Sequence, residues 1–218
     1  MQVKICGIKD KDILNAAVKA GADFIGLVFF PKSPRHVSIS QAKELAEFAR
    51  QGSNETPPKI VALVVNASNK ELEALIKEVQ PDYLQLHGTE TAERAQEISK
   101  LFKIPLIKAI GVSSADDVTT ADDYSAAEII LFDAKADPKL TCLPGGNGIP
   151  FDWTALKGQK ETRNFMLSGG LTAVNVAKAI NLTGASIIDV SSGVETSPGV
   201  KDEALIRAFI HASKQGSN

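Results

Sequence analysis

The sequence predicts an α/β protein in which the whole chain of 218 residues forms a single (β/α)8 barrel of the TIM type. Short, near-continuous apolar runs recur along the chain eight times, as expected for strands that are covered on both faces. Helical periodicity follows most of these runs, and no linker divides the chain. An open, doubly wound sheet is the alternative. Eight near-even units favour closure, and no G-x-G-x-x-G pattern follows the first strand.

The predicted strands share branched and aromatic apolar side chains. In chain order they are Val3–Cys6, Phe24–Phe29, Ile60–Val65, Tyr83–Leu86, Leu106–Ile110, Ile129–Phe132, Phe165–Leu167 and Ser186–Val190. The carboxyl ends of all strands meet at one face of a closed barrel, and the active sites of such barrels lie at that face. Residues at the ends of these runs are therefore the candidates for chemistry.

The segments between the strands carry apolar side chains at i, i+3, i+4 and i+7, the spacing of one helix face. Three such stripes are Ala42, Leu45, Ala46 and Ala49; Leu72, Leu75, Ile76 and Val79; and Ala173, Val176, Ala177 and Ile180. Ser68 and Glu71 form a capping-box pattern, and Gly184 stands just past a predicted helix end. The helices near Val118 and over 153–156 are only weakly patterned.

The balance of charges limits the partners. Lys and Arg number 24 and Asp and Glu 26, a net charge of −2, whereas a protein that neutralises several nucleic-acid phosphates is normally basic. No charge-free run approaches the roughly 20 residues of a membrane-spanning helix, and the N-terminal residues lack a secretory apolar stretch. We therefore expect a cytoplasmic protein that binds neither nucleic acid nor membrane. Its tail is expected to fray from about residue 213.

The cysteines and histidines show no metal-binding spacing, so no metal is expected. The two cysteines are Cys6 and Cys142. A disulfide between them requires a loop movement that brings their Cα atoms within about 7 Å. Two thiols that never meet are the simpler interpretation, since the cytoplasm keeps thiols reduced.

Two glycine- and serine-rich turns follow the last two predicted strands, and a helical segment follows each turn. Backbone N–H groups at such turns bind anions, and barrels that handle phosphorylated sugars frequently hold the phosphate there. We predict a phosphate site at Gly169, Gly170, Ser191, Ser192 and Gly193. The alternative is a pair of tight turns without a ligand.

Two strand ends carry candidates for acid and base chemistry. Cys6 ends the first predicted strand, where nearby positive groups would let its thiol ionise and act as a base. The alternative for Cys6 is a small buried apolar residue. Asp133 directly follows the sixth apolar run, where burial without a partner would be costly, so an acid role is predicted. A capping role is the alternative for Asp133.

Three further side chains follow or lie on the strands. Arg35 stands in a loop that contains Pro31 and Pro34, which suits a bidentate grip on a carboxylate, with a solvated surface arginine as the alternative. His87 is either a ligand contact or a satisfied structural histidine. Lys108 is the candidate Schiff-base lysine if the barrel is an aldolase.

Two segments of the chain are specific in sequence, the opening Val3–Ile8 and the segment Asp189–Glu195. Further segments that belong with them are Gly21–Asp23, Phe30–Arg35, Gln85–Gly88, Leu131–Asp133, Gly145–Gly148, Phe151–Trp153 and Leu167–Leu171. In this order, and over nearly the whole chain, they resemble the phosphoribosylanthranilate isomerases of tryptophan biosynthesis. Other phosphosugar barrels share the two glycine turns but not this opening.

The resemblance implies a cofactor-free Amadori rearrangement of N-(5-phosphoribosyl)anthranilate by a monomer or homodimer. It implies that Cys6 is the general base, Asp133 the general acid, and Arg35 the residue that holds the anthranilate carboxylate. His87 would lie near the substrate, and the two turns would hold the phosphate. Rival interpretations are an aldolase or synthase on the same barrel, and a phosphate-binding barrel that has lost its chemistry.

Overall fold

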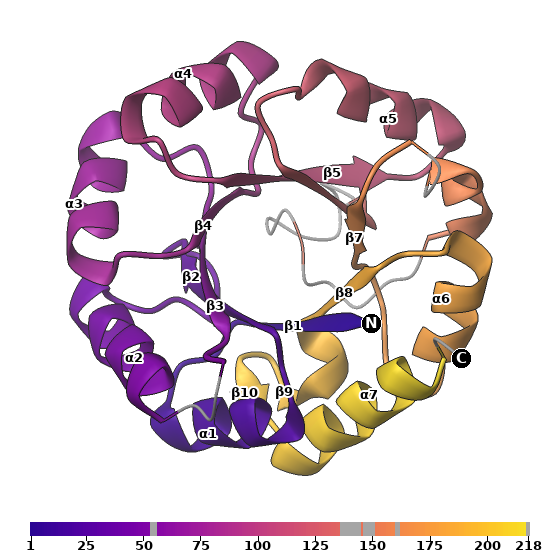
Figure 1. Cartoon of the computed structure of the whole chain (residues 1–218), viewed down its shortest axis with the longest axis horizontal. Coiled ribbons are helices and arrows are strands. Elements are labelled where there is room, and N and C mark those ends of the chain that lie inside the picture. The colour runs from indigo at the N-terminus through magenta and orange to yellow at the C-terminus, as the bar shows by residue number, and fades with distance from the viewer. Residues whose placement is uncertain (53–55, 136–144, 146–150, 160–161, 217–218) are drawn as a thin grey trace.

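The computed structural model describes residues 1–52, 56–135, 145, 151–159 and 162–216, and within these ranges eight parallel strands close into a barrel. The strands are β1 (Gln2–Cys6), β2 (Phe24–Phe29), β3 (Lys59–Val64), β4 (Tyr83–Leu86), β5 (Leu106–Val112), β6 (Ile129–Ala134), β7 (Phe165–Leu167) and β8 (Ile187–Val190). They follow one another in chain order, and β8 pairs in parallel with β1, where Val3 lies opposite Ile188. This closure confirms the predicted barrel and excludes the open sheet (Figure 1).

Helices form the outer ring of the molecule (Figure 1). They are α1 (Lys11–Ala20), α2 (Ile39–Gln51), α3 (Asn69–Val79), α4 (Ala92–Phe102), α5 (Ala115–Thr119), α6 (Val176–Thr183) and α7 (Glu203–Gln215). The helices are shortest where the sequence pattern is weak. Helix α5 is short and continues as the 3₁₀ helix η1 (Thr120–Asp123), and η2 (Trp153–Leu156) is a 3₁₀ turn. None of the helices in the described ranges is long and apolar enough to cross a membrane.

Local signals in the sequence set several helix ends. The capping box at α3 is confirmed, because the Ser68 hydroxyl accepts from the backbone N–H of Glu71 and the Glu71 carboxylate accepts from the N–H of Ser68. Gly184 ends α6 in the left-handed conformation, as predicted. The predicted stripe of that helix begins too early, however, since Ala173 lies in the turn before α6.

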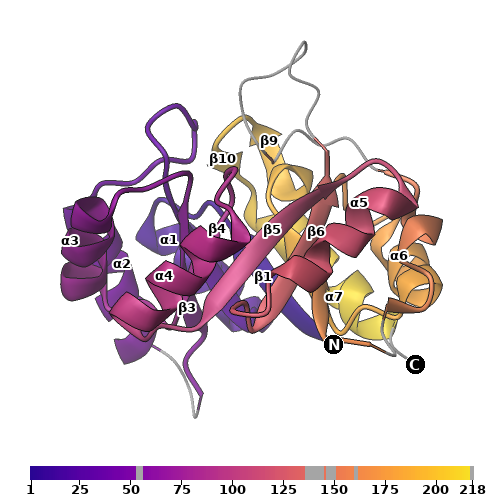
Figure 2. The same cartoon turned by 90° about the horizontal axis from the view of Figure 1, so that it is seen from above.

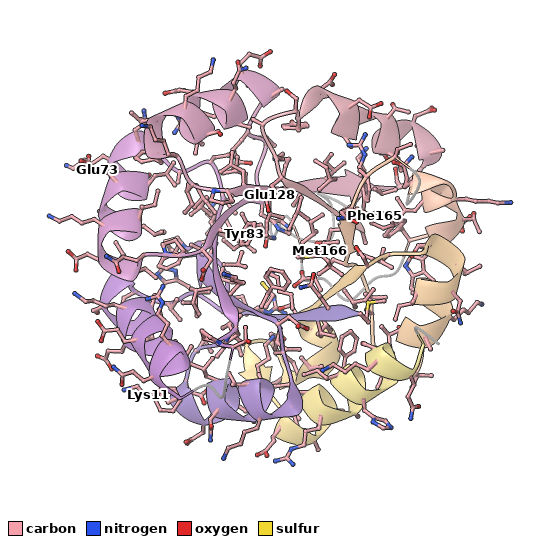
Figure 3. The ribbon with its side chains drawn as sticks, in the orientation of Figure 1. Lys11, Glu73, Tyr83, Glu128, Phe165 and Met166 are labelled. Atoms are coloured by element: carbon pink, nitrogen blue, oxygen red, sulfur yellow. The ribbon has the colours of Figure 1, made fainter. Side chains whose placement is uncertain are left out.

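The interior of the barrel is filled with side chains from alternate strand positions. Phe24, Leu131 and Met166 belong to this inner cluster. On each strand, the residues that alternate with the inward-facing ones face outward and pack against the helices. Figure 3 shows Met166 inside the ring and the side chains of Lys11 and Glu73 at its outer edge. The barrel is therefore a packed core, and an active site can form only where this core ends.

A small antiparallel hairpin stands between β8 and α7, and the sequence pattern did not predict it. Its strands are β9 (Glu195–Ser197) and β10 (Val200–Lys201). Figure 2 shows the hairpin at the upper end of the molecule and both termini at the lower end. The hairpin thus stands at the end of the barrel where the strands finish.

The expected fraying from about residue 213 is wrong for the described part of the tail. Helix α7 continues to Gln215, and Ser213 is fully buried with its hydroxyl donating to the carbonyl oxygen of Phe209 at 2.8 Å. The apolar face of α7, which includes Ile206 and Ile210, packs into the main core. Burial of this face orders the helix to its last turn.

Candidate active site

Polar side chains replace the apolar filling of the barrel near the carboxyl ends of the strands. Two-residue alternation from the interior residues Leu131 and Ile187 places Asp133 of β6 and Asp189 of β8 on the inner face. Six polar residues lie on the inner face, five of them on β1, β4, β6 and β8 and one directly after β4. They are Lys4, Cys6, Gln85, His87, Asp133 and Asp189. Each is at most 9 % exposed. A buried polar layer therefore covers the apolar core.

Cys6 ends β1 with 4 % of its surface exposed. It packs with Val28 and Leu63 in a small apolar cluster. Gly26 stands opposite Cys6 on β2, and a Cβ at that glycine would lie 2.8 Å from Sγ and 3.0 Å from Cα of Cys6. Glycine at this position therefore leaves the space that the sulfur occupies.

Replacing Gly26 with Ala should displace the thiol, because the neighbouring strand backbone cannot move away from the new methyl group without breaking its ladder. We expect kcat/KM to fall by about tenfold or more, the scale of a misplaced reacting group. The matched control is Gly52→Ala, since a Cβ there would lie 3.3 Å from the carbonyl oxygen of Phe48, away from the site. Equal activity of the two variants would show that the position of Sγ is not critical.

Lys4 and Asp189 form a buried ion pair close to Cys6. Nζ of Lys4 donates to Oδ1 of Asp189 at 2.9 Å. Burial raises the pKa of the Cys6 thiol; the charge of Lys4 opposes this rise, and the charge of Asp189 adds to it. Burial alone would lower the pKa of Lys4, but Asp189 and Cys6 together raise it. Lys4 therefore stays protonated and favours the thiolate form of Cys6.

His87 and Asp133 form a second polar pair. Nε2 of His87 lies 3.4 Å from Oδ2 of Asp133, and Nδ1 of His87 lies 2.7 Å from Nε2 of Gln85. An amide nitrogen only donates, so with this amide orientation Nδ1 is the acceptor and the ring proton is on Nε2, facing Asp133. Oδ1 of Asp133 accepts from the backbone N–H of Ala134 at 2.9 Å. Both carboxylate oxygens of Asp133 are thus held in a fixed orientation.

Gly145 lies directly against this pair. A Cβ at Gly145 would lie 2.6 Å from Oδ2 of Asp133 and would collide with Nε2 of His87. Gly145 therefore lies close to the carboxylate of Asp133. Cys142 and the residues on either side of Gly145 fall outside the described residues.

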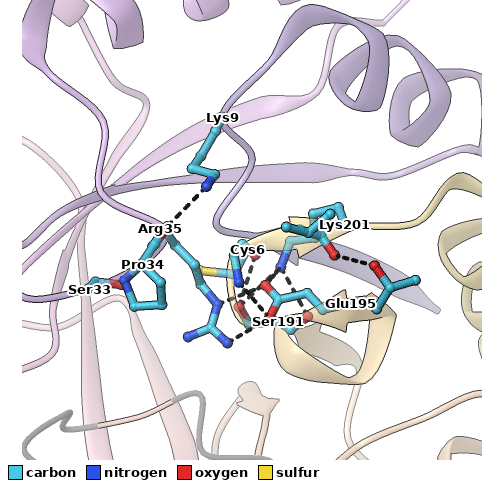
Figure 4. Close-up of polar contacts among 11 residues, drawn as sticks. Cys6, Lys9, Ser33, Pro34, Arg35, Ser191, Glu195 and Lys201 are labelled. Carbon is cyan, nitrogen blue, oxygen red and sulfur yellow. Dashed lines mark hydrogen bonds and ion pairs between the residues drawn. The ribbon is translucent and has the colours of Figure 1, made fainter.

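Arg35 is not a solvated surface arginine. It is 5 % exposed, and its Nε and Nη2 donate to the two carboxylate oxygens of Glu195, each at 2.8 Å. Glu195 also accepts from Nζ of Lys201 at 2.7 Å (Figure 4). The bidentate grip that was predicted for a ligand is therefore made here with Glu195, which fixes the plane of the guanidinium group.

This cluster of charges predicts a pH-dependent contribution to stability. Burial alone would raise the pKa of the Glu195 carboxyl, but the hydrogen bond from Arg35 and the charge of Lys201 lower it to about 2. Because the folded pKa lies below the unfolded one, Glu195 contributes stability above about pH 4.5 that is lost as pH falls toward 2.

We therefore expect the difference in unfolding free energy between the wild type and Glu195→Gln to be large at pH 7 and to shrink between pH 4.5 and 2. Urea unfolding of both proteins at several pH values measures this difference. Other carboxylates titrate in both proteins and cancel. A difference that stays constant over this range would contradict the pairing of Glu195 with Arg35 and Lys201.

The two glycine-rich turns lie against each other. Gly169 and Gly170 adopt φ angles of +91° and +63°, a region that favours glycine, and Nδ2 of Asn175 donates to the carbonyl oxygen of Gly170. A Cβ at Gly193 would collide with the carbonyl oxygen of Leu171. The turn after β8 thus packs directly on the turn after β7. The structure thus brings Gly193 of the second predicted turn against the end of the first.

The serines of the second turn have different surroundings. Oγ of Ser191 donates to the carbonyl oxygen of Cys6 at 3.1 Å. Ser192 opens η4 (Ser192–Val194), a short 3₁₀ turn, so the helical segment behind this turn is shorter than the sequence pattern suggested. The turn after β8 is thereby linked to the end of β1.

Lys108 does not belong to the inner layer. It lies between Ile107 and Ala109, which face the barrel interior, so its own side chain faces the helices. Its Nζ donates to the carbonyl oxygen of Gly88 at 2.9 Å and to Oε2 of Glu90 at 2.8 Å. Lys108 therefore anchors the loop after β4 and does not reach the inner polar layer.

Sequence reasoning missed four charged residues of this site. Lys4 and Asp189 interrupt apolar strands, and a buried charge needs a partner, so the pair was detectable in principle. Glu195 and Lys201 belong to the hairpin after β8, and their mutual contacts depend on a fold that no local pattern marks.

A closed (β/α)8 barrel with a buried thiol, a carboxylate–imidazole pair and two adjoining glycine turns at the carboxyl ends has the layout of the TIM-barrel enzymes. A family model described as N-(5'phosphoribosyl)anthranilate (PRA) isomerase matches residues 3–212. The chain belongs to this family.

Individual proteins agree with this assignment. The chain is 48 % identical to N-(5'-phosphoribosyl)anthranilate isomerase of Rhodopseudomonas palustris (strain BisA53), over 98 % of this chain and 96 % of that protein. The crystal structure of phosphoribosyl anthranilate isomerase from Thermotoga maritima has a TM-score of 0.86 at 34 % identity, with 99 % of each chain covered. Another solved structure, in complex with reduced 1-(o-carboxyphenylamino)-1-deoxyribulose 5-phosphate, has a TM-score of 0.82 at 34 % identity, also with 99 % of each chain covered.

Proposed function

We propose that this chain converts N-(5-phosphoribosyl)anthranilate to 1-(2-carboxyphenylamino)-1-deoxyribulose 5-phosphate in tryptophan biosynthesis, with Cys6 as general base and Asp133 as general acid. The observation that carries the proposal is the placement of these two residues. Each stands at or next to the carboxyl end of its strand and within the polar layer, and β7 and β8 separate the two strands around the barrel. A sugar held over this layer can be approached by acid and base from different sides.

The first step opens the ribose ring. Asp133 donates its proton to the ring oxygen, the bond between that oxygen and C1 breaks, and an iminium forms between C1 and the anthranilate nitrogen. The contacts of Asp133 with His87 and Ala134 favour one orientation of the carboxyl group throughout this step. Asp133 must carry the proton when substrate binds.

The second step moves a proton from C2. The iminium acidifies that proton, the Cys6 thiolate removes it, and the resulting enolamine becomes the ketone by taking up a proton at C1 and releasing the C2 hydroxyl proton. C1 is reduced and C2 is oxidised within one molecule, so the electrons balance without an external partner. The positive charge of Lys4 supports the thiolate.

Substrate binding divides between the two sides of the site. We assign the anthranilate carboxylate to Arg35, whose guanidinium is oriented by Glu195. We assign the phosphate to the adjoining turns, with the residues predicted from the sequence: Gly169, Gly170, Ser191, Ser192 and Gly193. Backbone N–H groups of such turns suit a phosphate. His87 would lie close to the reacting sugar through its contact with Asp133.

The aldolase alternative lacks support from the geometry. A Schiff-base lysine must reach the substrate as a neutral amine, whereas Lys108 is paired with Glu90 and faces the helices. Our proposal also includes a cytoplasmic location and a monomer or homodimer that needs neither metal nor cofactor. One solved relative from Thermotoga maritima is described as a dimeric isomerase from which monomers were generated.

The proposal is tested in a bacterial strain that needs tryptophan because its own phosphoribosylanthranilate isomerase gene is deleted. Expression of this chain should restore growth without tryptophan, and expression of Cys6→Ser or Asp133→Asn should not. Immunoblots of the soluble fraction confirm that all three proteins are present in equal amounts. Equal growth with wild type and both variants, or no growth with soluble wild type, would contradict the proposal.

A further inference from the structure

Lys201 is a buried lysine that joins three parts of the site. Its side chain is 2 % exposed and lies at the end of β10. Nζ donates to the carbonyl oxygen of Ser191 at 3.0 Å, to Oγ of Ser191 at 3.2 Å and to Oε1 of Glu195 at 2.7 Å. An ammonium group has three N–H donors, and these contacts give them acceptors on both β9 and the turn after β8.

The partners of Lys201 lead to two residues of the proposed reaction. Oγ of Ser191 donates to the carbonyl oxygen of Cys6 at 3.1 Å, so the chain of contacts from Lys201 ends at the proposed base. The Glu195 carboxylate is shared between Lys201 and Arg35. Figure 4 shows Cys6, Arg35, Ser191, Glu195 and Lys201 gathered in this one cluster.

We propose that Lys201 is a positioning residue for the isomerase reaction: it holds the turn after β8 and the Arg35–Glu195 pair in place, and its positive charge stabilises the Cys6 thiolate. This inference rests on the proposed function, because it assigns Lys201 a role through the proposed base. Neither the sequence pattern nor the resemblance pointed to this residue. The small hairpin thereby has a functional role, because it places Lys201 in the site.

The charges around Cys6 explain why Lys201 matters. Lys4 and Asp189 are paired with each other and largely cancel, and Glu195 is shared by the two cations Arg35 and Lys201. These five groups carry three positive and two negative charges, so the net charge near the sulfur is positive only while Lys201 is protonated. Loss of that charge leaves the cluster neutral.

The pKa directions agree with this geometry. Burial raises the pKa of the Cys6 thiol, and Lys4 and Lys201 both oppose that rise. Burial and the charge of Arg35 lower the pKa of Lys201 itself, and Glu195 and Cys6 counteract this decrease in part. Lys201 and Cys6 therefore favour each other's charged forms.

The first test measures the thiol without any substrate. Cys6 is alkylated with iodoacetamide over a range of pH in a Cys142→Ser background, and the labelled peptide is quantified by mass spectrometry. In Lys201→Met the midpoint of the rate–pH curve should rise by about one pH unit, the scale of a removed neighbouring charge. The control is Lys43→Met, which removes a surface lysine that pairs with Glu78 between α2 and α3.

Two further variants separate charge from structure. Lys201→Gln keeps a hydrogen-bond donor without the charge, so it should also raise the midpoint, and it replaces the Met variant if that protein does not fold. Lys201→Arg keeps the charge and should leave the midpoint near that of the wild type. The basic shift should appear equally in the pH profile of kcat/KM.

Unshifted midpoints in both neutral variants would overturn the inference. So would a raised midpoint in Lys201→Arg equal to that of Lys201→Gln, because the effect would then follow from disturbed packing and not from charge. These results are independent of the proposed function, which fails separately if the wild-type protein does not isomerise phosphoribosylanthranilate. A raised midpoint in Lys43→Met would likewise contradict a local effect of Lys201.

Discussion

Asp133→Asn is expected to reduce kcat by about 10²-fold or more, the scale of a lost general acid. The substitution keeps the shape of the side chain and removes the proton that must reach the ring oxygen. The iminium then forms much more slowly, and every later step depends on that intermediate. Steady-state kinetics with purified protein measures the effect, with kcat and KM determined separately.

The surroundings of Asp133 let the Asn variant fold. Its amide oxygen can accept from the N–H of Ala134 as Oδ1 of Asp133 does, while its NH2 group would face His87. His87 can then carry its proton on Nδ1 if the Gln85 amide turns over, and Oε1 of Gln85 is a buried atom that has no hydrogen-bond partner in the described structure. Unchanged kcat with a raised KM would make Asp133 a binding residue and contradict the acid assignment.

Cys6→Ser is expected to bind substrate and lose most of its turnover, by about 10²-fold or more. A hydroxyl group is a far weaker base than a thiolate near neutral pH. The positive charge of Lys4 cannot compensate, because it supports an ionised sulfur and no alkoxide forms in this pH range. Single-turnover kinetics with enzyme in excess measures the chemical step directly.

A matched control for Cys6→Ser is Ser213→Ala, which removes one buried hydroxyl of α7 outside the site. It should lower stability without a comparable effect on kcat. Product binding, measured by calorimetry, should be similar in the wild type and Cys6→Ser. Turnover of Cys6→Ser at nearly the wild-type rate would refute the assignment of the base while leaving the fold and the family assignment in place.

The closed barrel was predictable because buried parallel strands leave near-continuous apolar runs. The β2, β4 and β7 boundaries agree with the prediction, and the structure adds residues to β5 and β6, whose last positions are Val112 and Ala134. The η2 turn replaces a full helix because the pattern around Trp153 has only a single turn of apolar residues. The buried end of α7 was missed because burial, and not propensity, orders Ser213.

The sequence could predict a site residue only where a reactive side chain stands at the end of a predicted strand. Cys6 and Asp133 could be found from the ends of their strands, although the sequence does not determine their roles. The contact of Arg35 with Glu195 joins residues that are 160 positions apart, and no local spacing could indicate it. Lys201 lies in an antiparallel hairpin whose two strands together contain only five residues. Strands this short produce no periodic sequence pattern.

The central claim is tested most directly by adding the purified wild-type protein to freshly prepared N-(5-phosphoribosyl)anthranilate. The fluorescence of the substrate should fall in proportion to the amount of protein. Chromatography should identify 1-(2-carboxyphenylamino)-1-deoxyribulose 5-phosphate as the product, and Cys6→Ser and Asp133→Asn serve as controls. Release of free anthranilate alone, or a fluorescence decay no faster than without protein, would contradict the account.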